Sequence, residues 1–432
     1  MTAPVRSART RGSRLVRAGI WAGLTGLTVL ASATARAQAQ GPTLADTATA
    51  NSVGARSKAA YDPPGIGLGA FTLYPTLAAR IEYDDNVFNV ENERHSDGRA
   101  IIVPGLSFVN AAPDHGLTLR ADATLVRYAD LSLQNNEQYQ VEGQGYLALG
   151  EARIDMSGGY GRLTEQAGSL GEAVIGAPNT YTRLAGRAGV TLDLAGITFN
   201  ASGGAEQFDY RTVHLEDEDV LQNYRDRTAY SISSRLGLRA GSSLRVFVQG
   251  YYNWQDYREN FGGLSQNSQG YSVLGGVSFG LTALMSGEIS VGYLSQDYDE
   301  PGSGTVSGLT YAGRIIWNPT ALMTAKLNVD RALEASPYYN QPGVIRDGVD
   351  LDLDYELLRN LIVSVTVGYR HYDYFGSDRR DSQFRAGLDA RWLIGRNLEL
   401  GLGLSHRDQS SHGFQARPFT GNAALLSLRI KG

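Results

Sequence analysis

The sequence predicts an all-β protein: a closed antiparallel transmembrane β-barrel of about 18 strands, with short periplasmic turns and longer outer loops. Three observations support this fold class. Apolar and polar residues alternate at period two, short and long connections alternate, and no long uninterrupted apolar run follows residue 37. Alternation at period two is typical of a strand with two different faces. A sheet that crosses lipid must close on itself, because lipid cannot form hydrogen bonds with an open edge.

The N-terminus has the three parts of a secretory signal peptide. Arginines between Arg6 and Arg17 precede an apolar stretch from Ala18 to Ala33, and the segment 35–37 fits the small-x-small cleavage rule. We therefore expect residues 1–37 to be removed, with cleavage after Ala37 or Ala39. Residues 38–60 are small, polar and without period, so we expect a disordered periplasmic tail or linker there. The barrel itself is expected over residues 61–432.

Period-two alternation recurs from Tyr61 to the C-terminus. Leu117, Leu119 and Leu125, for example, share one face of a segment whose other face carries Arg120 and Asp122. Nine long polar loops and eight short turns separate such segments, which predicts eighteen strands. Because strand boundaries are uncertain by about 2–4 residues and the segment 99–111 contains a proline, sixteen strands are the alternative.

Composition excludes several classes of protein. A net charge of −5 and a pI of about 5.8 provide no basic field for nucleic acid. The absence of cysteine excludes disulfides and thiolate metal sites. The 52 glycines and 24 tyrosines suit a barrel, where small inward side chains and interfacial tyrosines are expected.

Candidate catalytic and metal-binding patterns are weak. The six histidines are His95, His115, His214, His371, His406 and His412. None belongs to a zinc-binding or nucleophile-elbow pattern. His371 and Asp373 share a face at the end of a predicted strand, but no nucleophile can be identified beside them. The acidic loop clusters reproduce no calcium-binding frame. We therefore predict no catalytic residue, no metal and no cofactor.

Four acidic residues, Asp350, Asp352, Asp354 and Glu356, share one face of a predicted strand whose other face is apolar. We call this row the acidic ladder. Charge on the lipid face is penalised, so we expect the ladder to point into the lumen. Lys326 and Arg370 are inward candidates on the adjacent strands, and cross-strand pairing is the structural explanation of the ladder. Any unpaired remainder in a water-filled lumen predicts cation preference.

Aromatic residues gather at strand ends and in loops. Interfacial belts explain the lipid-facing members. The inward and loop residues could instead stack on sugar rings. The candidates for such stacking are Tyr251, Tyr338, Tyr339 and Tyr372.

A short motif closes the first predicted strand. It consists of Tyr83, Asp84, Asp85, Asn86, Val87 and Phe88, and it is preceded by Glu82, Arg80 and Tyr74-Pro75. The motif resembles the opening of the putative beta-barrel porin 2 type proteins, with their EpsL-like members of exopolysaccharide operons, and the similarity in pattern runs from about residue 61 to the end. One departure is the C-terminus, where Lys431-Gly432 replaces the aromatic residue that often ends a barrel.

This resemblance implies an outer-membrane porin that serves synthesis or export of an exopolysaccharide or capsular polysaccharide. It implies outer-membrane lipid, a glycan chain and a periplasmic polysaccharide-export protein as partners, and no catalytic residues. A general diffusion porin for small hydrophilic solutes is the alternative, and a surface structural or adhesive barrel is a weaker third. A general porin usually narrows its lumen with an inward-folded loop, and no loop of this sequence identifies itself as one.

Overall fold

We analysed a computed structural model that describes most of the chain. The described residues are 48, 51–165, 167–170, 172, 174–215, 217–260, 265–282, 284–300, 304–336, 338 and 343–432. The predicted signal peptide, residues 1–37, lies outside them. Within these ranges, no helix has the length and apolar character needed to span a membrane.

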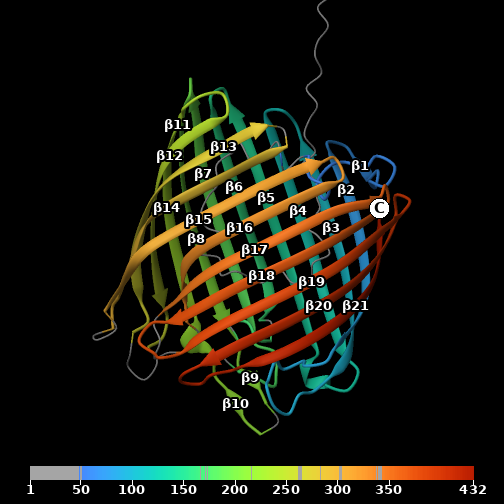
Figure 1. Cartoon of the computed structure of the whole chain (residues 1–432), viewed down its shortest axis with the longest axis vertical. Helices are drawn as coiled ribbons and strands as arrows, with labels where there is room; N and C mark the ends of the chain where they lie inside the picture. The colour runs from blue at the N-terminus through green and yellow to red at the C-terminus, as the bar shows by residue number, and fades with distance from the viewer. Residues whose placement is uncertain are drawn as a thin grey trace, which may run out of the picture.

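The described residues form one large antiparallel sheet that curls into a barrel (Figure 1). The sheet has 19 strands, and β1 (Ile66–Leu68) is a three-residue strand that pairs with β2 alone. The remaining eighteen strands form the wall. They are β2 (Phe71–Asp84), β3 (Asp97–Ala111), β4 (His115–Tyr128), β5 (Asn136–Leu149), β6 (Ala152–Thr164), β7 (Thr180–Leu194), β8 (Ile197–Tyr210), β11 (Arg227–Arg239), β12 (Leu244–Tyr257), β13 (Ser268–Thr282), β14 (Met285–Tyr298), β15 (Thr305–Thr320), β16 (Met323–Ala335), β17 (Gly343–Leu358), β18 (Leu361–Tyr374), β19 (Arg380–Ile394), β20 (Leu398–His412) and β21 (Phe419–Lys431).

The wall closes where the first long strand meets the last. β2 pairs with β21 from Thr76 opposite Lys431 to Asp84 opposite Ala423. Every wall strand therefore has two partners, and no edge remains for lipid to face. The fold class and the count of eighteen strands are confirmed.

The strand that contains Pro104, β3, is present, and its pairing with β2 is uninterrupted. Pro104 lies opposite Leu77 of β2, whereas the register with β4 ends at Ile102 and resumes at Gly105. A proline has no N–H to donate to a ladder, which explains the local interruption. The alternative of sixteen strands is therefore not needed.

Short turns gather at one end of the barrel and longer loops at the other. Two-residue connections such as 150–151 and 195–196 join strands at the end where β1 and the C-terminus lie (Figure 1). The opposite end carries the loops 85–96, 165–179 and 211–226, and the last contains the small hairpin of β9 (Val213–His214) and β10 (Asp219–Val220). We call these the short-turn end and the long-loop end.

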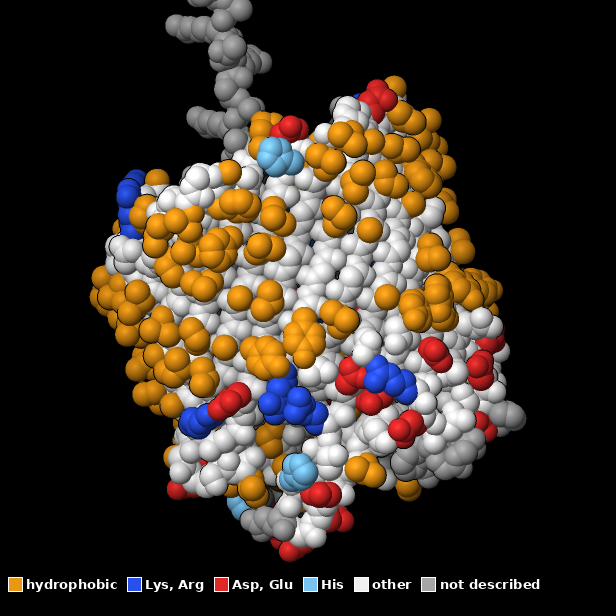
Figure 2. Space-filling model, turned by 180° about the vertical axis from the view of Figure 1, so that it is seen from behind, with side chains coloured by type: hydrophobic (Ala, Val, Ile, Leu, Met, Phe, Trp, Pro, Cys, Tyr) orange, Lys and Arg blue, Asp and Glu red, His pale blue; other side chains and the backbone are white. Residues whose placement is uncertain are grey.

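The outer surface of the wall is apolar. Outward side chains such as Ile81, Met156 and Leu426 are 67%, 57% and 58% exposed. Figure 2 shows hydrophobic side chains covering the wall, with charged side chains gathered at the long-loop end. An exposed apolar band of this kind suits a lipid environment. The chemistry of the molecule must therefore lie inside the barrel or at its ends.

Candidate functional site

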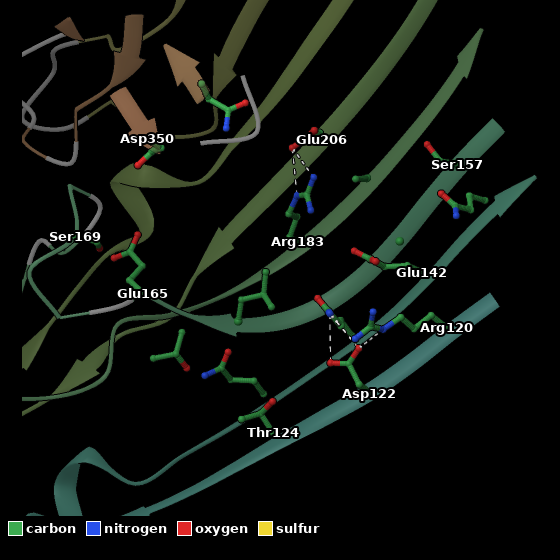
Figure 3. A pocket seen from close by; sticks show the side chains of 18 of the residues that line it. Arg120, Asp122, Thr124, Glu142, Ser157, Glu165, Ser169, Arg183, Glu206 and Asp350 are labelled. Atoms are coloured by element: carbon green, nitrogen blue, oxygen red, sulfur yellow. Dashed lines mark hydrogen bonds and ion pairs between the residues drawn. The ribbon is translucent and has the colours of Figure 1, made fainter. Parts of the chain in front are cut away.

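The inward faces of the wall strands enclose a cavity of about 2620 Å³. Because side chains alternate across a strand, each wall strand that exposes an apolar row to the outside also lines the lumen with polar or charged residues. Figure 3 shows two ion pairs of this lining, Arg183 with Glu206 and Arg120 with Asp122. Their nitrogen–oxygen distances are both 3.1 Å. The lumen is thus a polar space bounded by paired charges.

The acidic ladder of β17 has a partner at each step on the lumenal side. Asp350 accepts hydrogen bonds from Arg370 at 3.1 Å and from Arg385 at 2.5 Å. Asp352 accepts one from Thr366 at 3.0 Å. These contacts tie β17 to β18 and β19 from inside the barrel.

The lower half of the ladder is engaged in the same way. Asp354 accepts hydrogen bonds from Lys326 at 3.1 Å and from Ser364 at 2.7 Å. Glu356 is paired with Arg56 and Lys58. The ladder therefore leaves little unpaired negative charge, and its geometry favours the structural explanation over cation preference.

One long loop folds into the lumen, which the sequence did not reveal. The described residues of this loop, 165, 167–170, 172 and 174–179, are here called the inward loop; they follow β6 and reach the wall on the other side of the barrel. Its Gly168 carbonyl accepts a hydrogen bond from Gln383 of β19 at 3.4 Å, and its Glu172 carbonyl accepts one from Arg417 at 3.2 Å. Its Leu170 packs against a buried cluster that contains Tyr372 of β18. The loop therefore narrows the lumen near the long-loop end.

Further contacts fix the base and flank of the inward loop. Glu165 forms a buried bidentate pair with Arg225, at 2.6 and 3.1 Å, and the Arg225 guanidinium lies 3.9 Å from the ring centre of Tyr210. Asn89 donates to the carbonyl of Ala167 at 2.8 Å. The inward loop is thus held from several elements of the wall.

Glu172 of the inward loop is poised to titrate near neutral pH. Burial raises its pKa to about 7, although the Gly168 N–H at 2.7 Å and the nearby Arg417 act in the opposite direction. A carboxyl whose pKa is higher in the docked loop than in the free loop favours docking when it is protonated. Docking should therefore be strongest below about pH 4.5, the ordinary value, and should weaken as pH rises towards about 7.

An N-terminal segment occupies the short-turn end of the lumen. We call residues 51–62 the mouth segment. Ser52 and Val53 are each 1% exposed, and the Val53 N–H donates to Thr324 of β16 at 2.9 Å. Just before the segment, the Ala48 carbonyl accepts a hydrogen bond from Asn318 of β15 at 2.9 Å. Part of the mouth segment also lines the cavity.

The mouth segment differs from our expectation of a disordered tail over residues 38–60. Its composition is polar, but Val53 finds a buried site on the wall, and Arg56 and Lys58 meet the buried carboxylate of Glu356. Composition alone cannot reveal such contacts, because they involve partners about 300 residues away. Most of residues 38–50 lie outside the described residues.

The four candidate sugar-stacking tyrosines have different surroundings. Tyr251 and Tyr372 line the cavity, and Tyr372 is nearly buried. Tyr338 packs on Tyr374 with ring centres 6.4 Å apart, and the Arg379 guanidinium lies 5.3 Å from its ring. Tyr339 lies outside the described residues. Among the described candidates, Tyr251 combines an inward position with a partly exposed side chain.

The motif at the end of β2 fastens the loop that follows it. Tyr83 points outward and is 54% exposed, whereas Asp84 is buried and accepts hydrogen bonds from Arg407 at 2.7 and 2.8 Å. Asn86 is fully buried and donates to the carbonyl of Thr420 at 3.0 Å. These contacts join β2 to β20 and β21 at the long-loop end.

The other motif residues support the same loop. Asp85 accepts hydrogen bonds from the backbone and side chain of Asn422 at 2.6 and 2.7 Å. Val87 is buried, and Phe88 lies edge-to-face on His95 with centres 5.5 Å apart. The motif thus has a structural role at the closure of the barrel.

The structure provides a hydroxyl beside His371 that the sequence did not identify. Ser382 of β19 lies 2.9 Å from His371 Nδ1, and Asp373 lies 3.5 Å from His371 Nε2. Asp373 is also paired with Arg380 at 3.0 Å. Ser382 sits inside a strand paired on both sides, so its N–H is not available to stabilise an oxyanion. This geometry does not favour catalysis.

Among the described residues, no three His, Asp or Glu side chains form a group that could hold a metal ion.

Comparison with known proteins identifies a family for this chain. The model of the family described as Putative beta-barrel porin 2 matches residues 58–432. No curated protein sequence matches the chain. Similar solved structures include OccK2 (OpdF) of Pseudomonas aeruginosa in complex with glucuronate. It is 12% identical with a TM-score of 0.46, and the alignment covers 83% of the present chain and 98% of OccK2. The ferric enterobactin receptor PfeA of the same species, a mutant, has 8% identity, TM-score 0.43, and 83% and 80% coverage. Acinetobacter baumannii OccAB3 has 11% identity, TM-score 0.43, and 83% and 99% coverage.

Proposed function

Because the chain belongs to the putative beta-barrel porin 2 family, we propose that it is a porin-like conduit of the outer membrane through which a secreted polysaccharide passes. The observation that carries this proposal is the polar cavity of about 2620 Å³ inside a closed wall. The apolar outer band supports a location in lipid. The passenger would be an exopolysaccharide or a capsular polysaccharide.

The lining supports a hydroxyl-rich passenger. Arginine and carboxylate side chains present hydrogen-bonding groups along the lumen, and Tyr251 presents a ring suited to the C–H face of a sugar. A periplasmic polysaccharide-export protein would dock at the short-turn end, next to the mouth segment. The conduit itself needs no cofactor and no catalytic residue.

A general diffusion porin for small hydrophilic solutes is the second candidate, and the inward loop favours it. This loop crosses towards β19 and packs on Tyr372, which narrows the lumen as a solute-sized filter would. A polymer would need the inward loop and the mouth segment to leave more room, whereas a small solute would not.

Deletion of the gene followed by two assays distinguishes the candidates. A polysaccharide conduit predicts loss of surface polysaccharide with accumulation of glycan inside the cell envelope, restored by the wild-type gene. A general porin predicts unchanged surface polysaccharide and slower uptake of small hydrophilic solutes. Unchanged polysaccharide together with unchanged uptake would contradict both.

A further inference from the structure

Two arginines on the lumenal wall differ from the other charges described above. Arg80 of β2 and Arg429 of β21 both line the cavity. Across the described residues, neither makes a hydrogen bond or an ion pair, and the Nε atom of Arg80 is buried without a partner. A buried donor without a partner is costly, so this pair requires an explanation.

The register places the two arginines close together on the strands that close the barrel. Arg80 lies opposite Ser427, and Arg429 lies opposite Ala78. The two arginines are therefore diagonal neighbours on one face, with backbone positions about 7–8 Å apart. Ala78 and Ser427, the register partners of Arg429 and Arg80, have short side chains, and both are buried. The two guanidinium groups are near enough to repel each other.

The nearest carboxylates, Glu82 and Glu399, attract Arg80 and Arg429 respectively, but each is also engaged with another cation. Glu82 is paired with Arg99, and Asp122 is paired with Arg120. Glu399 lies opposite Arg429 in the register, but its charge is offset by Lys431 at 3.2 Å.

Two further charges on β19, Asp389 and Arg391, share one face and have opposite signs, so together they add no net charge. Arg391 and Arg120 also repel Arg429. An excess of positive charge therefore remains around Arg80 and Arg429, and it faces the cavity.

We propose that Arg80 and Arg429 form a binding site for the carboxylate groups of an anionic passenger. A carboxylate between the two side chains would relieve their repulsion and supply the acceptor that Arg80 Nε lacks. A guanidinium is a planar fork that matches the two oxygens of a carboxylate. The inference rests on the proposed function as a conduit and narrows its passenger to an acidic glycan or an acidic small solute.

Binding to purified protein in detergent tests the site without requiring conduction. The probe is trigalacturonate, which carries carboxylates, and maltotriose is its neutral control. Calorimetry should detect trigalacturonate binding to the wild type and binding weakened about tenfold in Arg80→Gln/Arg429→Gln, as expected for loss of one charge-assisted hydrogen bond. Arg235→Gln/Glu288→Gln removes a matched lumenal pair and should leave binding unchanged.

Ion selectivity in planar bilayers provides the second measurement. In a salt gradient, Arg80→Gln/Arg429→Gln should shift the reversal potential towards cations, whereas the Arg235/Glu288 control should not. Equal trigalacturonate affinity of the wild type and Arg80→Gln/Arg429→Gln, or binding of maltotriose as strong as that of trigalacturonate, would overturn the site. If the site binds as expected but the deletion strain keeps its surface polysaccharide, the site stands and the polysaccharide function fails. If the protein binds trigalacturonate and its deletion abolishes surface polysaccharide, the passenger is an acidic glycan. If it binds trigalacturonate and its deletion leaves surface polysaccharide unchanged, the passenger is a small acidic solute.

Discussion

Replacing Glu356 by glutamine should release the mouth segment from the short-turn end of the lumen. Glu356 is 7% exposed, and its carboxylate pairs with both Arg56 and Lys58. The variant keeps the size of the side chain and removes its charge. Neither cation has another ion-pair partner among the described residues, so both would lose their charge-assisted contact.

The size of the effect follows from these two contacts. A hydrogen bond to a charged group contributes roughly 1.5–3 kcal/mol. The Arg56 side chain is 26% exposed and that of Lys58 is 12% exposed, so solvent screens the first contact more than the second. Because the two contacts share one carboxylate, we expect a combined loss of about 3 kcal/mol. A loss of this size raises the undocked population about 100-fold.

The absence of native cysteine makes the assay direct. Val53 is 1% exposed in the docked segment, so Val53→Cys should react slowly with a water-soluble maleimide in detergent-purified protein. Adding Glu356→Gln should accelerate labelling about 100-fold, because labelling follows the open population. Adding Glu334→Gln, which breaks the buried pair with Arg346 at the other end of the barrel wall, is the matched control. An equal labelling rate in the Glu356→Gln background would refute the clamp.

Four further predictions concern the lumen and its loops. Conductance of the wild type should be lower at pH 5 than at pH 8, because protonated Glu172 favours docking of the inward loop. Conductance of Glu172→Gln should not change between these pH values. Gly168→Ala should undock the same loop and raise conductance, since Gly168 has φ +71° and a Cβ there would lie 2.9 Å from Phe419 and 3.0 Å from Asn89; an unchanged conductance would count against the inward loop as a constriction. Asp350→Asn should lower the temperature at which the folded form disappears on a heat-modifiability gel, because Arg370 and Arg385 lose their shared partner at a cost of about 3–5 kcal/mol; Thr118→Ser is a neutral lumenal comparison. Cysteine at position 217, but not at position 242, should be labelled on intact cells if the long-loop end faces outside, and the reverse pattern would invert the topology.

The wall of the barrel was predictable because its determinants are local. Period-two alternation in segments such as 117–125 and 349–357 requires no knowledge of partners, and turn lengths alone separated the strands. The lumenal direction of the acidic ladder was also inferred from one strand, since lipid rejects its charges. The structure places Asp350 and Asp352 among the cavity-lining residues.

The features that occupy the lumen could not be predicted in this way. The inward loop resembles the other loops in length and polarity. Its docking depends on Gln383, Arg417 and Tyr372, which are all more than 200 residues away. The mouth segment has the composition of a disordered tail, and its buried position depends on Thr324 and Glu356. The cation preference predicted from the ladder also depended on partners that only the structure provides, including Arg385 and Lys58.

The sequence by itself determined the closed wall, the number of its strands and the direction of their faces, because the pleat and the exclusion of unpaired backbone from lipid act on each strand separately. Only the tertiary structure decided which lumenal charges are neutralised and which remain. Closure brings β2 beside β21, strands nearly 350 residues apart, and so places Arg80 diagonal to Arg429. The sign of the charge that a passenger meets depends on such pairs, since a charge acts on its neighbours in space whatever their distance along the chain.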